Sequence, residues 1–255
     1  MKIFRLYTVV MMALMSGCIK VDETLTLEKN GSGNLELIYA IPEQTVSQMK
    51  SMFKLREQMD TVLGHAMPRT IEDEFEQVFF DPSEDRIKLL VKKYEKLGIT
   101  MDTLKVETRN AVRNVTLKVA FADLGEVARA DFFPRHGFSL FRNNDDTYTF
   151  SRLPDNDETI LKPRGIAPES AGLLSPVLSG FRVALKVNTP GKIFESNASR
   201  KALYNAAWIF DFDKDPNAVE TLQNQSMKII FDGKGSKLPE VRQLAKSTNA
   251  RTHQR

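Results

Sequence analysis

The chain has 255 residues, and its 36 lysines and arginines nearly balance its 33 aspartates and glutamates. Nucleic-acid-binding proteins usually have a strong excess of basic residues, which this chain lacks. We therefore expect no nucleic-acid partner. The single cysteine excludes an intramolecular disulfide and a zinc site built from several cysteines. Residues 18–255 suffice for one large domain or two small ones.

The first eighteen residues have the layout of a secretory signal peptide. Two basic residues lie near the start, an uncharged and mostly apolar run covers 6–15, and two small residues, Ser16 and Gly17, precede Cys18. An α-helix needs about 20 apolar residues to span a bilayer, and this run is too short. We therefore predict a cleaved signal peptide over 1–17 rather than a permanent transmembrane helix.

The sequence Leu-Met-Ser-Gly-Cys at 14–18 resembles the bacterial lipobox. The resemblance implies cleavage between Gly17 and Cys18, a diacylglycerol thioether on Cys18, and membrane anchoring through palmitate-type acyl chains. Ile19 stands where an aspartate commonly retains Gram-negative lipoproteins in the inner membrane. We therefore expect a location at the outer membrane, facing the periplasm.

A β-hairpin is the first predicted element of the folded part. Apolar residues alternate with polar ones on both sides of the sequence Asn-Gly-Ser-Gly at 30–33, and Asn and Gly readily adopt the positive φ of a hairpin turn. The inward row would contain Val21, Leu25, Leu27, Leu35, Leu37, Tyr39 and Ile41.

Two helices are predicted next. The first runs over 43–63, with Pro42 in its first turn. The second runs over 83–97, with Asp81 or Ser83 as its N-terminal cap and Gly98 at its end.

Strand patterns dominate the rest of the chain. A short helix near 124–129 and a proline-rich loop over 154–176 interrupt them, and the alternating runs lie at 104–108, 115–121, 138–141, 148–153, 181–187, 208–212 and 227–231. The sum predicts an α+β fold, a largely antiparallel β-sheet with two main helices packed on one face. We assign 18–233 to this domain, with a subdivision near 154–176 left open, and 234–255 to a basic disordered tail.

Several of these segments resemble the LppM-like lipoproteins of bacterial envelopes. They are the hairpin after Cys18, the sequence Asn-Thr-Pro-Gly-Lys at 188–192 between two strands, Asn197 in the next turn, and Trp208 on a strand. The resemblance implies an envelope lipoprotein with a β-rich fold and a lipid-binding groove. Many such proteins end in a transmembrane helix, which this sequence does not show.

No catalytic motif is evident. The three histidines, His65, His136 and His253, are far apart in sequence and have no metal-binding spacing, and no G-x-S-x-G sequence is present. The glycine-rich stretch at 233–237 lacks the spacing of a phosphate-binding loop. We expect no enzyme, no catalytic residue and no cofactor.

Alternate acids at Asp211, Asp213 and Asp215 are typical of a calcium-binding loop. Pro216 occupies the position that requires glycine, and Leu222 the position that requires a bidentate glutamate. The pattern therefore favours the polar face of a strand followed by a turn, and we expect no metal. Trp208 would lie on the buried face of that strand.

The sequence thus predicts a non-enzymatic binding or interaction module of the cell envelope, with lipid as a candidate ligand. One alternative is a structural or assembly partner of an envelope complex, whose protein partner the sequence does not name. Another is a hydrolase in which carboxylates, or His65 and His136, converge in a cleft. Methionines on the first helix, Met49, Met52 and Met59, with Met67 beyond it, are typical of ordinary core or of a lipid cavity. An apolar cavity beneath that helix would favour lipid, and a filled core would favour docking.

Overall fold

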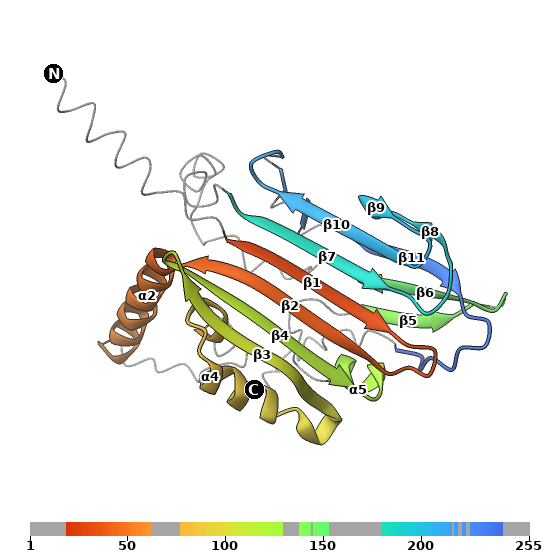
Figure 1. Ribbon diagram of the computed structural model, residues 1–255, viewed down its shortest axis with the longest axis horizontal. Coiled ribbons are helices and arrows are strands. Elements are labelled where there is room, and N and C mark those ends of the chain that lie inside the picture. Colours follow the sequence, from red (N-terminus) through yellow and green to blue (C-terminus); the bar gives the residue numbers. More distant parts are fainter. Residues whose placement is uncertain are drawn as a thin grey trace, which may run out of the picture.

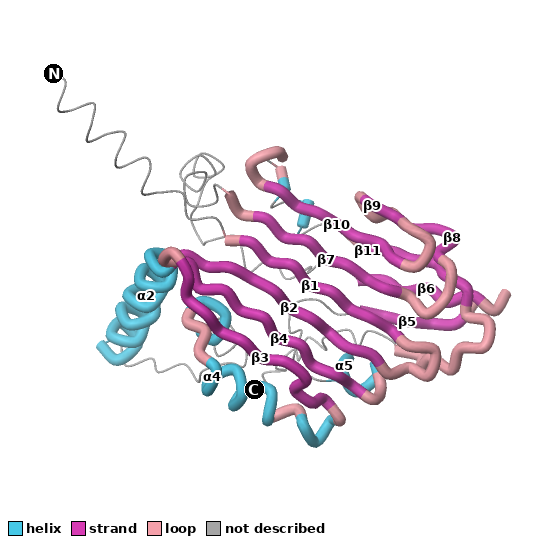
Figure 2. Tube along the Cα trace, viewed as in Figure 1, coloured by secondary structure: helices cyan, strands magenta, loops and turns pink. Residues whose placement is uncertain are grey.

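A computed structural model describes residues 19–62, 77–129, 138–143, 145–152, 180–215, 217–218, 221–222 and 225–241. The predicted signal peptide, Cys18 and the proline-rich loop lie outside these residues. The fold is a mixed α/β structure with two mostly antiparallel sheets (Figures 1 and 2). The predicted fold class is confirmed at this level.

The larger sheet has seven strands in the order β3-β4-β2-β1-β7-β10-β9. All neighbours are antiparallel except β1 and β7, which run in the same direction. The strands are β1 (Lys20–Leu27), β2 (Gly33–Pro42), β3 (Ile99–Arg109), β4 (Val112–Phe121), β7 (Arg182–Asn188), β9 (Arg200–Lys201) and β10 (Asn205–Asp211).

The smaller sheet is fully antiparallel in the order β5-β6-β11-β8. It packs against the part of the larger sheet that contains β1, β7 and β10, because side chains of both sheets line one cavity between them. Its strands are β5 (Phe138–Arg142), β6 (Thr147–Arg152), β8 (Ile193–Ser196) and β11 (Met227–Asp232).

The first hairpin forms as its sequence predicts. Leu25 pairs with Leu35 and Val21 with Tyr39, so the alternating apolar residues share one inward face. Gly31 adopts φ +88° in the turn, a conformation that costs glycine little.

Four helices complete the described fold: α2 (Glu43–Val62), α4 (Glu84–Lys92), the 3-10 helix η1 (Glu95–Leu97) and α5 (Leu124–Arg129). The predicted helix over 83–97 is thus two helices joined by a turn. Ser83 caps α4 by accepting a hydrogen bond from the Arg86 N–H, and Gly98 ends η1 with φ +71°.

The packing of two main helices on one face is not confirmed. Helix α4 buries Ile87, Leu90 and Val91, and it lies beside β3. Helix α2 instead extends past the strand ends (Figure 1). In its first turns Val46 is buried, whereas Ser47 is exposed. The helix therefore does not form a lid over the sheet.

The predicted tail boundary at residue 234 is wrong. Leu238 and Val241 are buried, and Val241 exchanges two backbone hydrogen bonds of 2.7 and 2.8 Å with Leu140 of β5. The Lys237 N–H donates to the carbonyl of Lys29, beside the first hairpin turn. Residues 234–241 therefore belong to the folded domain, because their two apolar side chains are enough to dock them; 242–255 lie outside the described residues.

Candidate functional site

A cavity of about 40 Å³ lies between the two sheets. Most of its wall is apolar, and two charged side chains, Glu23 and Arg152, line it from opposite sheets. The exposed residue Lys186 also borders it. The apolar lining consists of Leu25, Leu35, Phe138, Phe150, Leu185, Val187, Trp208 and Met227.

Strand alternation directs both charged side chains inward. Glu23 lies between Val21 and Leu25 in the inward row of β1, and it pairs in register with Leu37 and Leu185. In β6, Arg152 shares a row with Tyr148 and Phe150, and its register partners are Phe138 and Met227. Each charge therefore replaces an apolar residue that the alternation would place there.

Among the described residues, Glu23 is the one whose charge lies near Arg152. Nη1 of the arginine lies 3.7 Å from Oε1 of Glu23, and the two side chains are 12% and 22% exposed. Neither side chain makes a hydrogen bond to any residue that the structure describes. Burial lowers the pKa of Arg152, and the charge of Glu23 opposes this shift. A guanidinium has five N–H donors, and no residue in the described part of the chain accepts a hydrogen bond from those of Arg152.

Trp208 borders the same cavity and is fully buried, as its strand pattern predicts. It faces the second sheet rather than a helix layer. Its Nε1 donates to Oδ1 of Asn197 at 3.2 Å, and that oxygen also accepts from the Lys228 N–H at 2.9 Å. The indole is thereby fixed, and its fluorescence should report changes in the cavity.

The size of the cavity limits what it holds in this conformation. A buried water needs about 10–15 Å³ of such volume, whereas pockets for drug-sized ligands measure about 300–1,000 Å³. The space between the described parts of the sheets thus suits two or three waters or a small polar group. A longer ligand requires the sheets to move apart.

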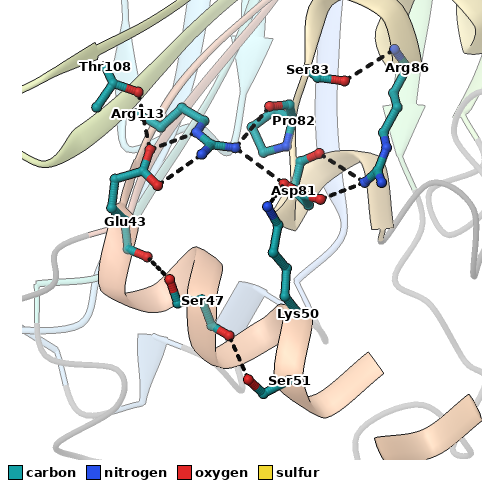
Figure 3. Close-up of polar contacts among 10 residues, drawn as sticks. All are labelled: Glu43, Ser47, Lys50, Ser51, Asp81, Pro82, Ser83, Arg86, Thr108 and Arg113. Atoms are coloured by element: carbon teal, nitrogen blue, oxygen red, sulfur yellow. Dashed lines mark hydrogen bonds and ion pairs between the residues drawn. The ribbon is translucent and has the colours of Figure 1, made fainter. Parts of the chain in front are cut away.

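A second cluster of charges lies where α2, α4 and β4 meet (Figure 3). Arg113 of β4 forms two hydrogen bonds with the Glu43 carboxylate, of 2.8 and 2.9 Å, and its Nη1 also contacts Asp81 at 3.3 Å. Asp81 in turn pairs with Lys50 at 2.8 Å and with Arg86 at 2.6 Å. The cluster joins the start of each helix to the end of the sheet.

The charges of this cluster stabilise one another. The hydrogen bond from Arg113 lowers the pKa of Glu43. Burial alone would raise the pKa of Asp81, but Lys50, Arg86 and Arg113 together lower it. All the named groups are engaged with each other and the cluster borders no cavity that the structure describes, so we regard it as structural.

Sequence reasoning missed both charged sites. The sequence signal that could have found them is a charged residue within a row of inward-facing apolar residues. Glu23 lies between Val21 and Leu25 in such a row, and Arg113 lies two residues before the buried Val115. Their partners come from distant segments, and no local pattern reveals that pairing.

The structure places the residues singled out from the sequence as follows. Gly17, Cys18 and the three histidines lie outside the described residues, and so does Met67; the side chains of Met52 and Met59 are also not described. The aspartates after β10 do not converge. Asp211 pairs with Lys214, Asp213 accepts from the Gly180 N–H, and Asp215 accepts from the Asn217 N–H. Within the described ranges no group of three or more His, Cys, Asp or Glu side chains could hold a metal ion.

The stretch over 233–237 is a loop, as predicted, with a turn closed by the Ser236 N–H and the Gly233 carbonyl. Among the described helices, none combines the length and the apolar character needed to cross a membrane.

Comparisons with known proteins give a likeness in structure but not in sequence. No protein family matches the sequence, and no curated protein matches it. Among solved structures, the chain is similar to the folded domain of LppM from Mycobacterium tuberculosis, determined by NMR. The identity is 13% and the TM-score 0.37, over 87% of this chain and 95% of that one. The resemblance to LppM-like lipoproteins is therefore a distant one of structure, without a sequence family.

Proposed function

We propose that this protein is a lipid-anchored, non-enzymatic binding module of the bacterial cell envelope. In this proposal, the space between its sheets receives an amphiphile whose headgroup carries a phosphate or carboxylate. The observation that carries the proposal is Arg152, a buried guanidinium in a mostly apolar cavity with one carboxylate at 3.7 Å and no hydrogen bond to a described residue.

The chemistry of the cavity matches both halves of an amphiphile. An arginine presents its donors as a planar fork that binds phosphate or carboxylate at two points. Burying a charge without full hydrogen bonding is costly, so an anion that completes the bonding of Arg152 gains free energy there. The apolar walls suit an alkyl chain once the sheets separate.

The anchoring part of the proposal is supported by the sequence. The signal-peptide layout and the lipobox-like sequence end at Cys18, and β1 begins at Lys20. Because so few residues separate the modified cysteine from the first strand, the start of β1 would be held at the membrane surface. Orientation toward the periplasm at the outer membrane is part of the same proposal.

A fluorescence titration tests the binding site. Trp208 is the only tryptophan and borders the cavity, so its emission should change saturably as decyl phosphate is added, below the micelle concentration. Decyl maltoside, which has the same chain and no charge, should give a much weaker response. Short chains are the appropriate probes because the closed cavity is small.

Two variants make the test specific. Arg152→Met should weaken decyl phosphate binding by roughly 10- to 100-fold. This factor corresponds to the loss of a hydrogen bond to a charged group, which contributes about 1.5–3 kcal/mol. Arg142→Met removes an exposed arginine of the same sheet, which is paired with Asp146, and should leave binding unchanged. Equal affinity of the wild type and Arg152→Met would refute the proposed site.

The assembly role has one observation in its favour. The interior of the described part is nearly filled, which is the condition that favours docking over lipid storage. If no amphiphile perturbs Trp208, a docking function becomes the better proposal.

A further inference from the structure

Three exposed apolar residues lie on two neighbouring segments. Phe194 of β8 is 52% exposed, and Leu203 and Tyr204 are each 51% exposed. The Ile193 N–H donates to the Leu203 carbonyl at 2.8 Å, which brings β8 beside the turn between β9 and β10. We call Phe194, Leu203 and Tyr204 the tip patch.

The turn itself does not require these residues. Leu203 and Tyr204 are the central pair of a tight turn, closed by the Ala202 N–H and the Asn205 carbonyl at 2.8 Å. Gly, Asn, Asp, Pro and Ser usually occupy such positions, because they suit turn geometry and water. About half of the Leu203 and Tyr204 surfaces nevertheless faces water, and exposed apolar groups on neighbouring segments mark interaction sites.

Cations surround the tip patch. Lys192 precedes β8, and Arg200 and Lys201 form β9. All three are exposed, and none forms an ion pair with any residue in the described part of the chain. The Lys201 Nζ donates to the backbone carbonyl of Phe194 at 3.3 Å, which places this positive charge beside β8. The neighbouring acid, Glu195, is already paired with Lys228.

We propose that the tip patch inserts into the interface of an anionic lipid bilayer. Tyrosine and leucine suit the boundary between headgroups and acyl chains, and nearby lysines and arginines are attracted to anionic headgroups. The surface thus combines the apolar and the positive character that such a membrane requires.

The strand register shows how far the tip patch lies from the start of β1. Thr26 pairs with Asn188, which pairs with Asn205 next to the tip patch, whereas Lys20 lies at the other end of β1. At about 3.3 Å per residue, the two ends are about 20 Å apart along the strands. Together with the proposed anchor at Cys18, the tip patch would hold the larger sheet along the membrane rather than upright. This orientation rests on the proposed anchor.

Single-cysteine labelling of the anchored protein tests the proposal. Cys18 is the only cysteine and would be blocked by its lipid, so Leu203→Cys in the full chain can carry an environment-sensitive fluorophore. The labelled protein is reconstituted into vesicles of phosphatidylcholine with or without phosphatidylglycerol, and flotation first confirms that it remains attached. Leu89→Cys is the matched control, because Leu89 is an exposed leucine whose neighbour Lys88 is paired with Glu84.

With phosphatidylglycerol present, the label at position 203 should shift to shorter wavelength and be quenched by spin-labelled lipid. The label at position 89 should do neither. Replacing Lys192, Arg200 and Lys201 with glutamine, or Phe194 and Tyr204 with serine, should abolish the shift. A label at 203 that emits as in water, or a shift that is unaffected by these replacements, would overturn the proposal. Loss of the protein from the vesicles at the flotation step would refute the proposed lipid anchor. This outcome is distinguishable from failure of the tip patch to insert, which the fluorescence measures.

Discussion

Glu23 and Arg152 approach each other from two different sheets, with Nη1 of the arginine 3.7 Å from Oε1 of the glutamate. Each occupies a position where the alternation of its strand calls for an apolar residue. Such a contact between largely buried charges gains little net free energy unless further hydrogen bonds complete it, and no described residue supplies one. The proposed headgroup site rests on this relationship.

Glu23 should determine which headgroups are accepted. Glu23→Gln removes a negative charge beside Arg152, so it should strengthen binding of a purely anionic amphiphile such as decyl phosphate. The same change should weaken binding of a phosphoethanolamine amphiphile, whose ammonium group Glu23 can pair with. Titrations of Trp208 fluorescence with both ligands measure the two affinities. Parallel changes for both ligands would show that Glu23 does not contact the headgroup.

The cluster around Arg113 should contribute to stability in a pH-dependent way. Arg113→Met removes the charge-assisted hydrogen bonds to Glu43 and should cost about 2 kcal/mol in the free energy of unfolding at pH 7. The pKa values of Glu43 and Asp81 are lowered in the folded protein. Their contribution is therefore fully present above the unfolded pKa values of about 4 and is lost as the pH falls through the lower folded values.

Urea unfolding of wild type and Arg113→Met between pH 7 and pH 2.5 measures this effect. The two curves should converge at the acid end. Lys105→Met is the control, because it removes an exposed ion pair with Glu107 and should change little at any pH. A constant difference between wild type and Arg113→Met down to pH 2.5 would contradict the assignment.

The segment over 235–241 should stabilise the domain. A chain that ends at residue 241 should exceed one that ends at 234 by about 3–5 kcal/mol in the free energy of unfolding, because the latter lacks the buried Leu238 and Val241. Val241→Ser in the full chain should reproduce part of the loss. Thermal and urea denaturation give both values, and equal stability of the two truncated chains would show that the segment does not dock.

Cys18→Ser should release the protein from the membrane or leave an uncleaved precursor. The acyl chains supply the proposed anchor, at about 0.8 kcal/mol for each buried methylene, and no described helix can span a bilayer. Fractionation in high salt, with immunoblotting for size, distinguishes the forms. Full retention of a processed Cys18→Ser protein in the membrane fraction would refute lipid anchoring through this residue.

Much of the local structure could be predicted from the sequence. The hairpin around Gly31, the strand that carries Trp208 and helix α5 all follow from periodicity and turn chemistry. The division into two sheets and the parallel pairing of β1 with β7 could not be predicted, because they depend on contacts between segments about 160 residues apart. The predicted helix over 83–97 consists of α4 and the separate 3-10 helix η1, a division that helical spacing alone does not show.

The candidate site was less predictable than the fold. The sequence left open whether the space beneath the helix over 43–63 is a lipid cavity or a filled core. That helix extends past the strand ends, and the cavity lies between two sheets instead. Trp208, Leu25 and Leu35 were predicted on buried faces, and all three line the cavity. Arg152 ends a strand whose row is otherwise aromatic, and its significance emerges only when Glu23 is placed opposite it.

Native mass spectrometry of the protein, released gently from its own membranes, detects the proposed ligand itself. We expect a bound amphiphile with a phosphate or carboxylate headgroup on the wild-type protein, and its loss from Arg152→Met but not from Arg142→Met. A wild-type protein that carries no such molecule, or an Arg152→Met protein that retains it in equal amount, would contradict the proposed binding site.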